Sequence, residues 1–182
     1  MRKDAAARRD KLIEVAAMLF ERDGYDIPLD AIVTTAGLGR ATLYRNFPDR
    51  TALMAAVLVY KLAELEQFVA AHDDDTTLLK AFVRKCGLNV LLHAPAVECL
   101  KADTSTGAVQ ESIAVMTARA DVLLDQIVMR SHAAGTLCAG ATAAHLRIVN
   151  KMVAAAACEP TEAQSNRLDV AVEIVTGGLS PR

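Results

Sequence analysis

Residues 38–50, which read LGRATLYRNFPDR, decide how the N-terminal part of this chain folds. The glycine at the second position can open a short helix, and Pro48 prevents that helix from continuing. Leu43 and Phe47 lie four residues apart, so we expect both on one buried helix face. The other face carries two cations and two hydroxyls: Arg40, Thr42, Tyr44 and Arg45. Such a face suits a phosphate backbone, so the stretch predicts the recognition half of a DNA-binding helix-turn-helix, with a short solvated connector helix as the alternative.

Two further helices are expected ahead of this segment. Between Ala5 and Asp23 apolar residues recur at helical spacing, and Gly24 is placed to end that helix in a left-handed turn. Pro28 suits the first turn of a short second helix. The small residues 36–39, AGLG, can form the turn into the third helix. The chain is therefore predicted to begin with a three-helix head.

A long helix is expected to follow the head. Asp49 can cap it, and no helix-breaking residue interrupts the sequence from Arg50 to about His72. The acidic residues 73–75 are interpreted as a solvated cap and loop rather than a metal site. Beyond them the chain is rich in Ala, Leu and Val and lacks the alternation of strands. The positions of the helix-breaking Pro and Gly residues predict helices at about 77–93, 95–102, 108–134, 141–157 and 162–176.

The predicted organisation is therefore all-α, with a helix-turn-helix domain at residues 1–49, whose recognition motif spans about 29–48, and a helical ligand-binding and dimerisation body at residues 50–182. A chain of 182 residues can bury a substantial core. Hydrophobic residues make up 53% of it, yet no apolar run reaches the roughly 18 residues that a membrane span needs. The excess apolar surface must be covered by protein, which indicates a subunit interface. No signal peptide follows Met1, so a cytoplasmic protein is expected.

The charge distribution is uneven along the chain, whose formal net charge is −2. Residues 1–61 hold ten Lys or Arg against eight Asp or Glu, whereas the remainder holds ten against fourteen. Because the local potential at the contact surface governs phosphate binding, a weakly acidic protein with a basic end can still bind DNA.

No enzyme chemistry and no cofactor are expected from the sequence motifs. The chain contains no Gly-rich phosphate loop, no E-x-x-H pair and no evident nucleophile and base arrangement. Its cysteines are widely spaced, lack zinc-ligand spacing and are interpreted as reduced and mostly buried: Cys86, Cys99, Cys138 and Cys158. A thiol- or metal-responsive regulator with the same head, and a helical dimer that does not bind DNA, remain alternatives.

The whole arrangement resembles a TetR-family transcriptional regulator. The motifs that carry the resemblance over residues 8–60 are AAMLF at 16–20, GY at 24–25, LDAI at 29–32, AGL at 36–38 and TLYRNFPDRTAL at 42–53. The C-terminal region is less specific, with GTL at 135–137, ATAAHL at 141–146 and RLD at 167–169. The resemblance implies an all-helical homodimer that binds a palindromic operator, usually as a repressor that a small molecule releases.

The resemblance also implies which residues contact DNA. The recognition helix begins at Arg40, and five of its side chains would face the major groove or flanking phosphates: Arg40, Ala41, Thr42, Tyr44 and Arg45. Arg50 stands where the family usually has lysine, and it would bind a phosphate at a helix N-terminus. A flexible N-terminal arm would add contacts through Arg2, Lys3, Arg8 and Arg9. Three departures from the family pattern are Gly39 in place of a capping serine, Val33 and Asn46.

Two apolar stripes in the last two helices are expected to form the dimer interface. Each stripe has spacings of three and four residues, which suits a four-helix bundle with a second copy, although such stripes can also be ordinary core. Their members are Leu146, Val149, Val153, Leu168, Val172, Val175 and Leu179. In such a dimer the two heads must match successive major grooves, about 34 Å apart, and a ligand that shifts the long helix would change that spacing.

A ligand pocket is expected where polar side chains interrupt apolar helices of the body. Cys86, Asn89 and His93 form one polar stripe at positions i, i+3 and i+7. It would line a mostly apolar pocket for an unidentified small-molecule effector together with Met116, Arg119, Gln126 and Met129. The alternative is that the stripe meets solvent or makes satisfied hydrogen bonds in the core.

Overall fold

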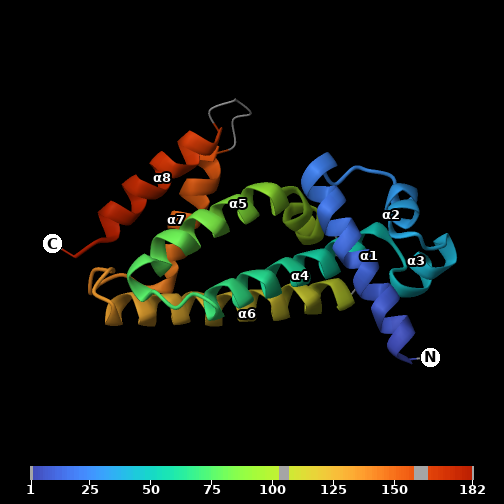
Figure 1. The fold of residues 1–182 in the computed structure, drawn as a ribbon, viewed down its shortest axis with the longest axis horizontal. Helices are drawn as coiled ribbons and strands as arrows, with labels where there is room; N and C mark the ends of the chain where they lie inside the picture. The colour runs from blue at the N-terminus through green and yellow to red at the C-terminus, as the bar shows by residue number, and fades with distance from the viewer. Residues whose placement is uncertain (1, 103–106, 158–163, 182) are drawn as a thin grey trace. The chain divides into compact units, whose positions relative to one another are not determined.

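The computed structural model describes residues 2–102, 107–157 and 164–181. Within these ranges the chain forms eight α-helices and no β-strand, which confirms the all-α fold (Figure 1). The helices are α1 (Arg2–Asp23), α2 (Leu29–Ala36), α3 (Arg40–Asn46), α4 (Arg50–Ala70), α5 (Asp75–Ala102), α6 (Gly107–Ala133), α7 (Ala143–Ala157) and α8 (Gln164–Leu179). None of the helices in these ranges is long and apolar enough to cross a membrane.

The chain divides into two compact units. The first contains residues 1–62 and 92–116, and the second contains residues 63–91 and 117–182. This division differs from the expected one between residues 49 and 50, because α4, α5 and α6 each contribute to both units.

One hydrophobic core holds the first unit together. α1 contributes Leu12 and Phe20, which are fully buried, and the end of α5 contributes Leu100. Helices α1, α2 and α3 pack against one another, as Figure 1 shows at the N-terminal end of the chain. The same core includes residues of the first half of α4. Burial of large side chains from every helix of the head stabilises this arrangement.

Two glycines with positive φ set the turns between the first three helices. Gly24 ends α1 with φ +85°, as the sequence predicted. Gly37 ends α2 with φ +64°, and its N–H donates to the carbonyl of Thr34 at 3.1 Å. The N–H of Leu38 donates to the carbonyl of Val33 at 2.9 Å. These two bonds form a Schellman motif, which turns the chain sharply toward α3.

The second unit contains a tight crossing of α5 and α7. A Cβ atom added to Gly87 would lie 2.5 Å from Cγ1 of Val153 and 3.5 Å from Cδ1 of Leu168. Only a glycine allows this approach without a shift of its neighbours. Helices α7 and α8 pack against each other (Figure 1).

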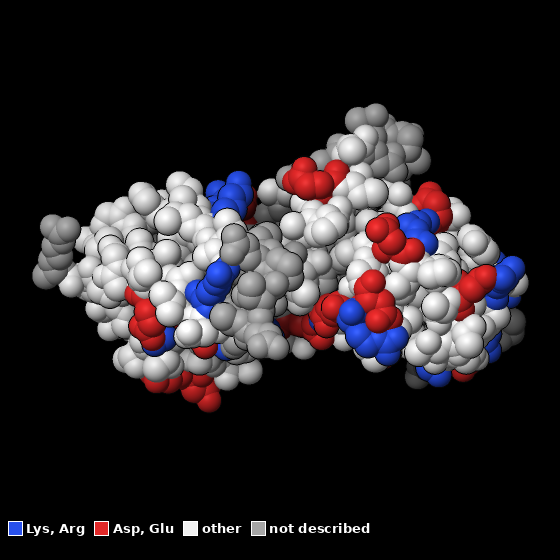
Figure 2. All heavy atoms as spheres, turned by 90° about the horizontal axis from the view of Figure 1, so that it is seen from above, with Lys and Arg blue, Asp and Glu red and all other residues white. Residues whose placement is uncertain are grey.

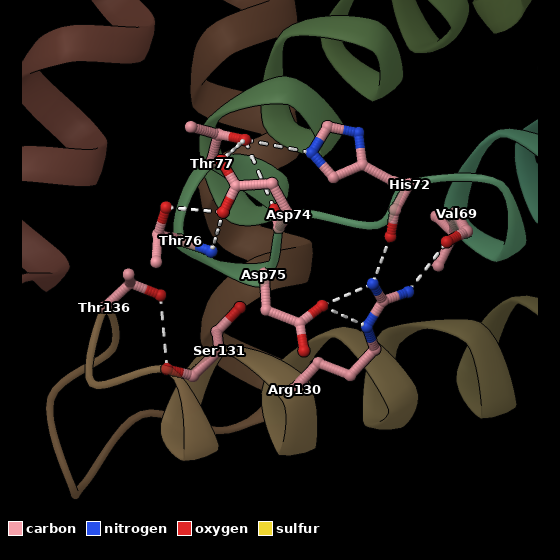
Figure 3. Close-up of polar contacts among 9 residues, drawn as sticks. All are labelled: Val69, His72, Asp74, Asp75, Thr76, Thr77, Arg130, Ser131 and Thr136. Atoms are coloured by element: carbon pink, nitrogen blue, oxygen red, sulfur yellow. Dashed lines mark hydrogen bonds and ion pairs between the residues drawn. The ribbon is translucent and has the colours of Figure 1, made fainter.

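Arg130 of α6 fastens the turn between α4 and α5 (Figure 3). Its Nη1 donates to the carbonyl of Val69 at 2.7 Å, its Nη2 donates to the carbonyl of His72, and its Nε contacts Oδ1 of Asp75 at 2.6 Å. Asp74 caps α5 by accepting the N–H of Thr76 at 3.0 Å. The acidic triplet thus provides a helix cap, as expected, and also an ion pair to α6.

Several helix boundaries differ from the sequence-based expectation. The expected break at Pro95 is wrong, because α5 continues through this exposed proline. The carbonyl that loses its N–H partner there can be hydrated, so the cost is tolerable. The expected end of α8 near Thr176 is also wrong, since Gly177 and Gly178 keep negative φ and the helix continues to Leu179. α1 begins at Arg2 rather than Ala5.

Candidate nucleic-acid interface

The recognition helix α3 is anchored by one face and exposed on the other. Leu43 and Phe47 are 1% and 2% exposed, which confirms that both point into the core. Tyr44 is 52% exposed, and three neighbouring residues are exposed too: Arg40, Ala41 and Arg45. Thr42 is half-buried. The helix therefore presents to solvent four of the five α3 residues that the resemblance predicted for DNA contact.

The exposed face of α3 is organised by hydrogen bonds within the head. Nε of Arg45 donates to the carbonyl of Ala41 at 3.0 Å, and Nδ2 of Asn46 donates to the carbonyl of Thr42 at 2.7 Å. Arg40 forms an exposed ion pair with Asp30 of α2. Among the described residues no carboxylate pairs with Arg45, so its positive charge is available to a phosphate or a base edge.

Arg50 has a structural role that the sequence did not reveal. Its Nη1 donates to the carbonyl of Tyr25 and its Nη2 donates to the carbonyl of Ile27, both at 2.7 Å. The side chain is half-buried. Because both terminal nitrogens bind the loop between α1 and α2, Arg50 fastens the start of α4 to that loop rather than standing ready for a phosphate. No local pattern signalled this contact, which spans more than twenty residues.

The expected flexible N-terminal arm is not seen, because α1 is helical from Arg2. Arg8 and Arg9 lie within this helix, and the guanidinium of Arg9 lies over the ring of Phe47 at 5.2 Å from its centroid. This cation–π contact links α1 to the end of α3. The side chains of Arg2 and Lys3 lie outside the described residues.

The two helix caps beside the recognition helix agree with the sequence. Gly39 is the N-cap of α3 and provides no side-chain hydrogen bond. Oδ1 of Asp49 accepts the N–H of Ala52 at 2.7 Å and so caps α4. The recognition helix is therefore weakly capped at its start and followed at once by a well-capped helix.

Sequence reasoning missed a polar contact behind this surface. His93 of α5 is 4% exposed, and its Nδ1 lies 2.6 Å from the hydroxyl of Tyr25 in the loop between α1 and α2. Burial, followed by the negative charge of Glu21, raises the pKa of the Tyr25 hydroxyl, so the phenol keeps its proton. No local pattern could have paired these residues, because 68 positions separate them.

The seven predicted pocket residues are divided between the two compact units. His93 and Met116 belong to the first unit, and the other five belong to the second. Arg119 forms a double contact with Glu66, with Nε and Oε1 3.0 Å apart. Gln126 is exposed, and Met129 is 65% exposed on α6. The pocket itself therefore stays a prediction.

Burial suppresses ionisation of Cys86, the cysteine of the polar stripe. Cys86 and Asn89 are half-buried, and burial raises the pKa of the Cys86 thiol to about 12. Cys99 is exposed and Cys138 is half-buried, while Cys158 lies outside the described residues. In the described part of the chain no group of three or more His, Cys, Asp and Glu is placed to hold a metal ion.

The residues of the predicted dimer stripe are mostly buried within the single chain, which agrees with the alternative that they are ordinary core, and the interface itself stays a prediction. The stripe members Leu146, Val149, Val153, Leu168 and Val172 are buried within the single chain, and Val175 and Leu179 are half-buried. They form part of the core of the second unit, as the Gly87 crossing shows for Val153 and Leu168. Other faces of the same helices carry exposed apolar side chains: Ile148, Met152, Val170 and Ile174.

Comparison with known proteins is consistent with this geometry. The model of the family "Bacterial regulatory proteins, tetR family" matches residues 12–57. The HTH-type transcriptional regulator SAR2658 of Staphylococcus aureus is 39% identical over 109 residues, which cover 56% of this chain and 58% of that protein. SAB2452 of another S. aureus strain is 37% identical over 76 residues, 41% of each chain. The chain thus spans about half of the length of these curated relatives.

Two solved structures extend the similarity over nearly the whole fold. A TetR transcription regulatory protein from Mycobacterium vanbaalenii superimposes with a TM-score of 0.72 at 23% identity, covering 98% of both chains. The regulator SCO0520 from Streptomyces coelicolor gives a TM-score of 0.68 at 25% identity, covering 95% of this chain and 98% of that chain. Residues 12–57 therefore form a helix-turn-helix domain of the TetR type, and the chain has the fold of TetR-family transcriptional regulators.

Proposed function

We propose that the protein is a cytoplasmic, DNA-binding transcriptional regulator, and that it acts as a homodimeric repressor which a small-molecule ligand releases from a palindromic operator. The observation that carries the proposal is the two-sided helix α3. Its inward residues Leu43 and Phe47 are almost fully buried, while Arg40, Tyr44 and Arg45 are exposed. A rigidly held helix with exposed cations and hydroxyls can enter a major groove and contact bases and phosphates.

The residues of α3 have distinct proposed roles. Arg45 supplies an unneutralised charge and a planar donor group, which suits a guanine edge or a phosphate. Tyr44 supplies a ring and a hydroxyl at an accessible position. Arg40 remains a candidate for a phosphate contact, at the cost of its exposed pair with Asp30, which is worth little in water. Ala41 and Thr42 complete the contact surface, with Ala41 small enough to let the helix approach the bases.

A second copy of the chain is the proposed occupant of the exposed apolar face of α7 and α8. Ile148 and Met152 are one helical turn apart on α7, and Val170 and Ile174 are one turn apart on α8. In Figure 2 the surface at the left is uncharged over its upper part and carries acidic and basic side chains along its lower edge. The two helices pack together, so two copies would form a four-helix arrangement that covers these side chains.

Selection from random DNA can identify the operator directly. Purified protein would be used to select bound duplexes from a random pool, and its affinity for the selected duplex and for a scrambled duplex would be measured across a salt series. We expect a palindromic consensus whose half-sites lie about one helical turn apart, and binding that weakens steeply with salt.

Arg45→Ala tests the recognition helix directly. We expect this variant to bind the selected duplex at least about tenfold more weakly, because a charge-assisted contact to a base or phosphate is lost. Arg84→Ala is the matched control, since Arg84 is an exposed arginine of α5 in the second unit that pairs with Asp169. Enrichment of no sequence, or equal weakening by both substitutions, would contradict the proposed function.

A further inference from the structure

Tyr25 is the point at which three elements of the first unit meet. Its ring stacks on Phe20 of α1, with the ring centroids 4.5 Å apart and the planes inclined by 24°. Its backbone carbonyl accepts a hydrogen bond from Arg50 at the start of α4. Its hydroxyl lies 2.6 Å from Nδ1 of His93 on α5. A residue of the short loop between α1 and α2 thus contacts the helix before it, the helix after the recognition helix, and a distant helix.

The surroundings of His93 determine which partner donates. Its Nε2 lies 3.6 Å from Oε1 of Glu21, and Glu21 pairs with Nζ of Lys61 at 2.6 Å. The Tyr25 hydroxyl keeps its proton, so it donates to Nδ1 when the neutral ring carries its proton on Nε2, the nitrogen that faces Glu21. This bond is buried, so a loss of either partner leaves a polar group without water or protein to replace it.

We propose that the hydrogen bond between Tyr25 and His93 is the latch through which α5 holds the DNA-binding head in its operator-binding form. The proposal rests on the proposed function. Arg50 binds the carbonyls of Tyr25 and Ile27 and also begins α4 directly after the recognition helix. The hydroxyl that contacts His93 and the carbonyl that Arg50 binds belong to the same residue. A displacement of the Tyr25 hydroxyl therefore also shifts the carbonyl that accepts from Arg50.

The latch gives α5 control over the recognition surface without contact between α5 and DNA. A movement of the segment of α5 around His93 must either break the bond or pull Tyr25 with it. In the first case the loop between α1 and α2 loses its distant anchor, and in the second case the Arg50 contacts are displaced. Either change disturbs a preorganised binding surface, which lowers affinity for a rigid partner. Tyr25 and His93 are therefore positioning residues for α3.

The test is a cycle of three variants: Tyr25→Phe, His93→Leu and the double variant. Each would be measured for affinity to the selected operator and for hydrogen exchange of residues 38–50 by mass spectrometry. We expect each single variant to bind the operator about three- to tenfold more weakly, the scale of one net hydrogen bond. We expect faster exchange in residues 38–50 and unchanged affinity for a scrambled duplex. The double variant should bind no more weakly than the singles, because all three lack the same bond.

Thermal stability separates a latch from a merely structural contact. The double variant replaces both polar partners with apolar groups, so its melting temperature should exceed those of the single variants while its operator affinity stays low. Val97→Ala is the matched control in the same part of α5, since Val97 is partly buried against the same core. It should lower the melting temperature and leave operator affinity and exchange of residues 38–50 unchanged.

Two results would overturn the proposal. One is wild-type operator affinity in both single variants. The other is exchange in residues 38–50 that rises equally in Val97→Ala, which would show that any loss of packing disturbs the head. If the wild-type protein selects no operator, the proposed function fails, whereas the exchange measurement still decides whether His93 controls the order of the recognition helix.

Discussion

At the scale of single residues, burial determines whether a titratable side chain of this protein can ionise and react. Cys86 is the clearest case, since its burial raises the pKa of its thiol to about 12. A thiol reacts as its thiolate, so a cysteine of this kind is inert near neutral pH. The alternative of a thiol-responsive regulator therefore gains no support from Cys86.

Cys86 is expected to be alkylated far more slowly than Cys99 in the native protein. At pH 8 a pKa of about 12 leaves roughly a thousandfold less thiolate than the ordinary value of 9.0. Because the pKa is raised in the folded state, the contribution of Cys86 to stability is present below about pH 9 and is lost as the pH rises toward 12. Timed iodoacetamide labelling and peptide mass spectrometry would measure both rates, with the unfolded protein as the control. Equal native rates would restore the thiol-responsive alternative.

At the scale of helices, the packing of the second unit depends on how closely α5 and α7 approach each other as well as on the apolar stripes of its helices. The crossing of α5 and α7 at Gly87 places Val153 and Leu168 in the core. This contact explains why the inward stripe of α7 faces its own chain and leaves Ile148 and Met152 exposed. Periodicity identifies the helix, but it does not tell which of two apolar faces turns inward.

Gly87→Ala is expected to destabilise the protein by about 1–3 kcal/mol, because the new methyl group would overlap Cγ1 of Val153 in a packed core. Chemical denaturation would give the loss in free energy of unfolding. Val153→Ala provides the partner for a double-mutant cycle. The double variant should be less destabilised than the sum of the single variants, since the smaller side chain makes room for the methyl group. Additive effects would show that the two positions do not touch.

At the scale of the whole molecule, the apolar face of α7 and α8 that remains exposed is where a second copy is proposed to bind. Ile148 and Met152 on α7, and Val170 and Ile174 on α8, are exposed apolar pairs one helical turn apart, and clustered exposed apolar side chains mark interaction sites more often than isolated ones do. Ile174 is 69% exposed, and the helical Gly177 and Gly178 follow it, which would let a partner helix approach closely.

Ile174→Asp is therefore expected to convert the protein from a dimer to a monomer at micromolar concentration, because a charge would be buried without a partner in the interface. Light scattering coupled to gel filtration would measure the mass. Met18→Asp is the matched control, since Met18 is an exposed apolar residue of α1 in the first unit. A dimer that survives Ile174→Asp, or a wild-type monomer, would contradict the proposed interface.

The sequence by itself determined the helix-turn-helix head. Its signals are local: Leu43 and Phe47 four residues apart, the left-handed glycine at position 24, the turn at residues 36–39, and the cap at Asp49. Each depends on neighbours within a few positions along the chain, where backbone geometry is enough to predict the outcome.

Only the tertiary structure decided which apolar stripe of α7 and α8 is core, where Arg50 points, and that His93 meets Tyr25. These outcomes depend on contacts between residues far apart in the sequence, such as Gly87 with Val153. A helix that is apolar on two faces has no local reason to prefer one of them, and a buried histidine has no local sign of its partner. The packing of segments that are distant in the sequence determines both the buried face of the helix and the partner of the histidine.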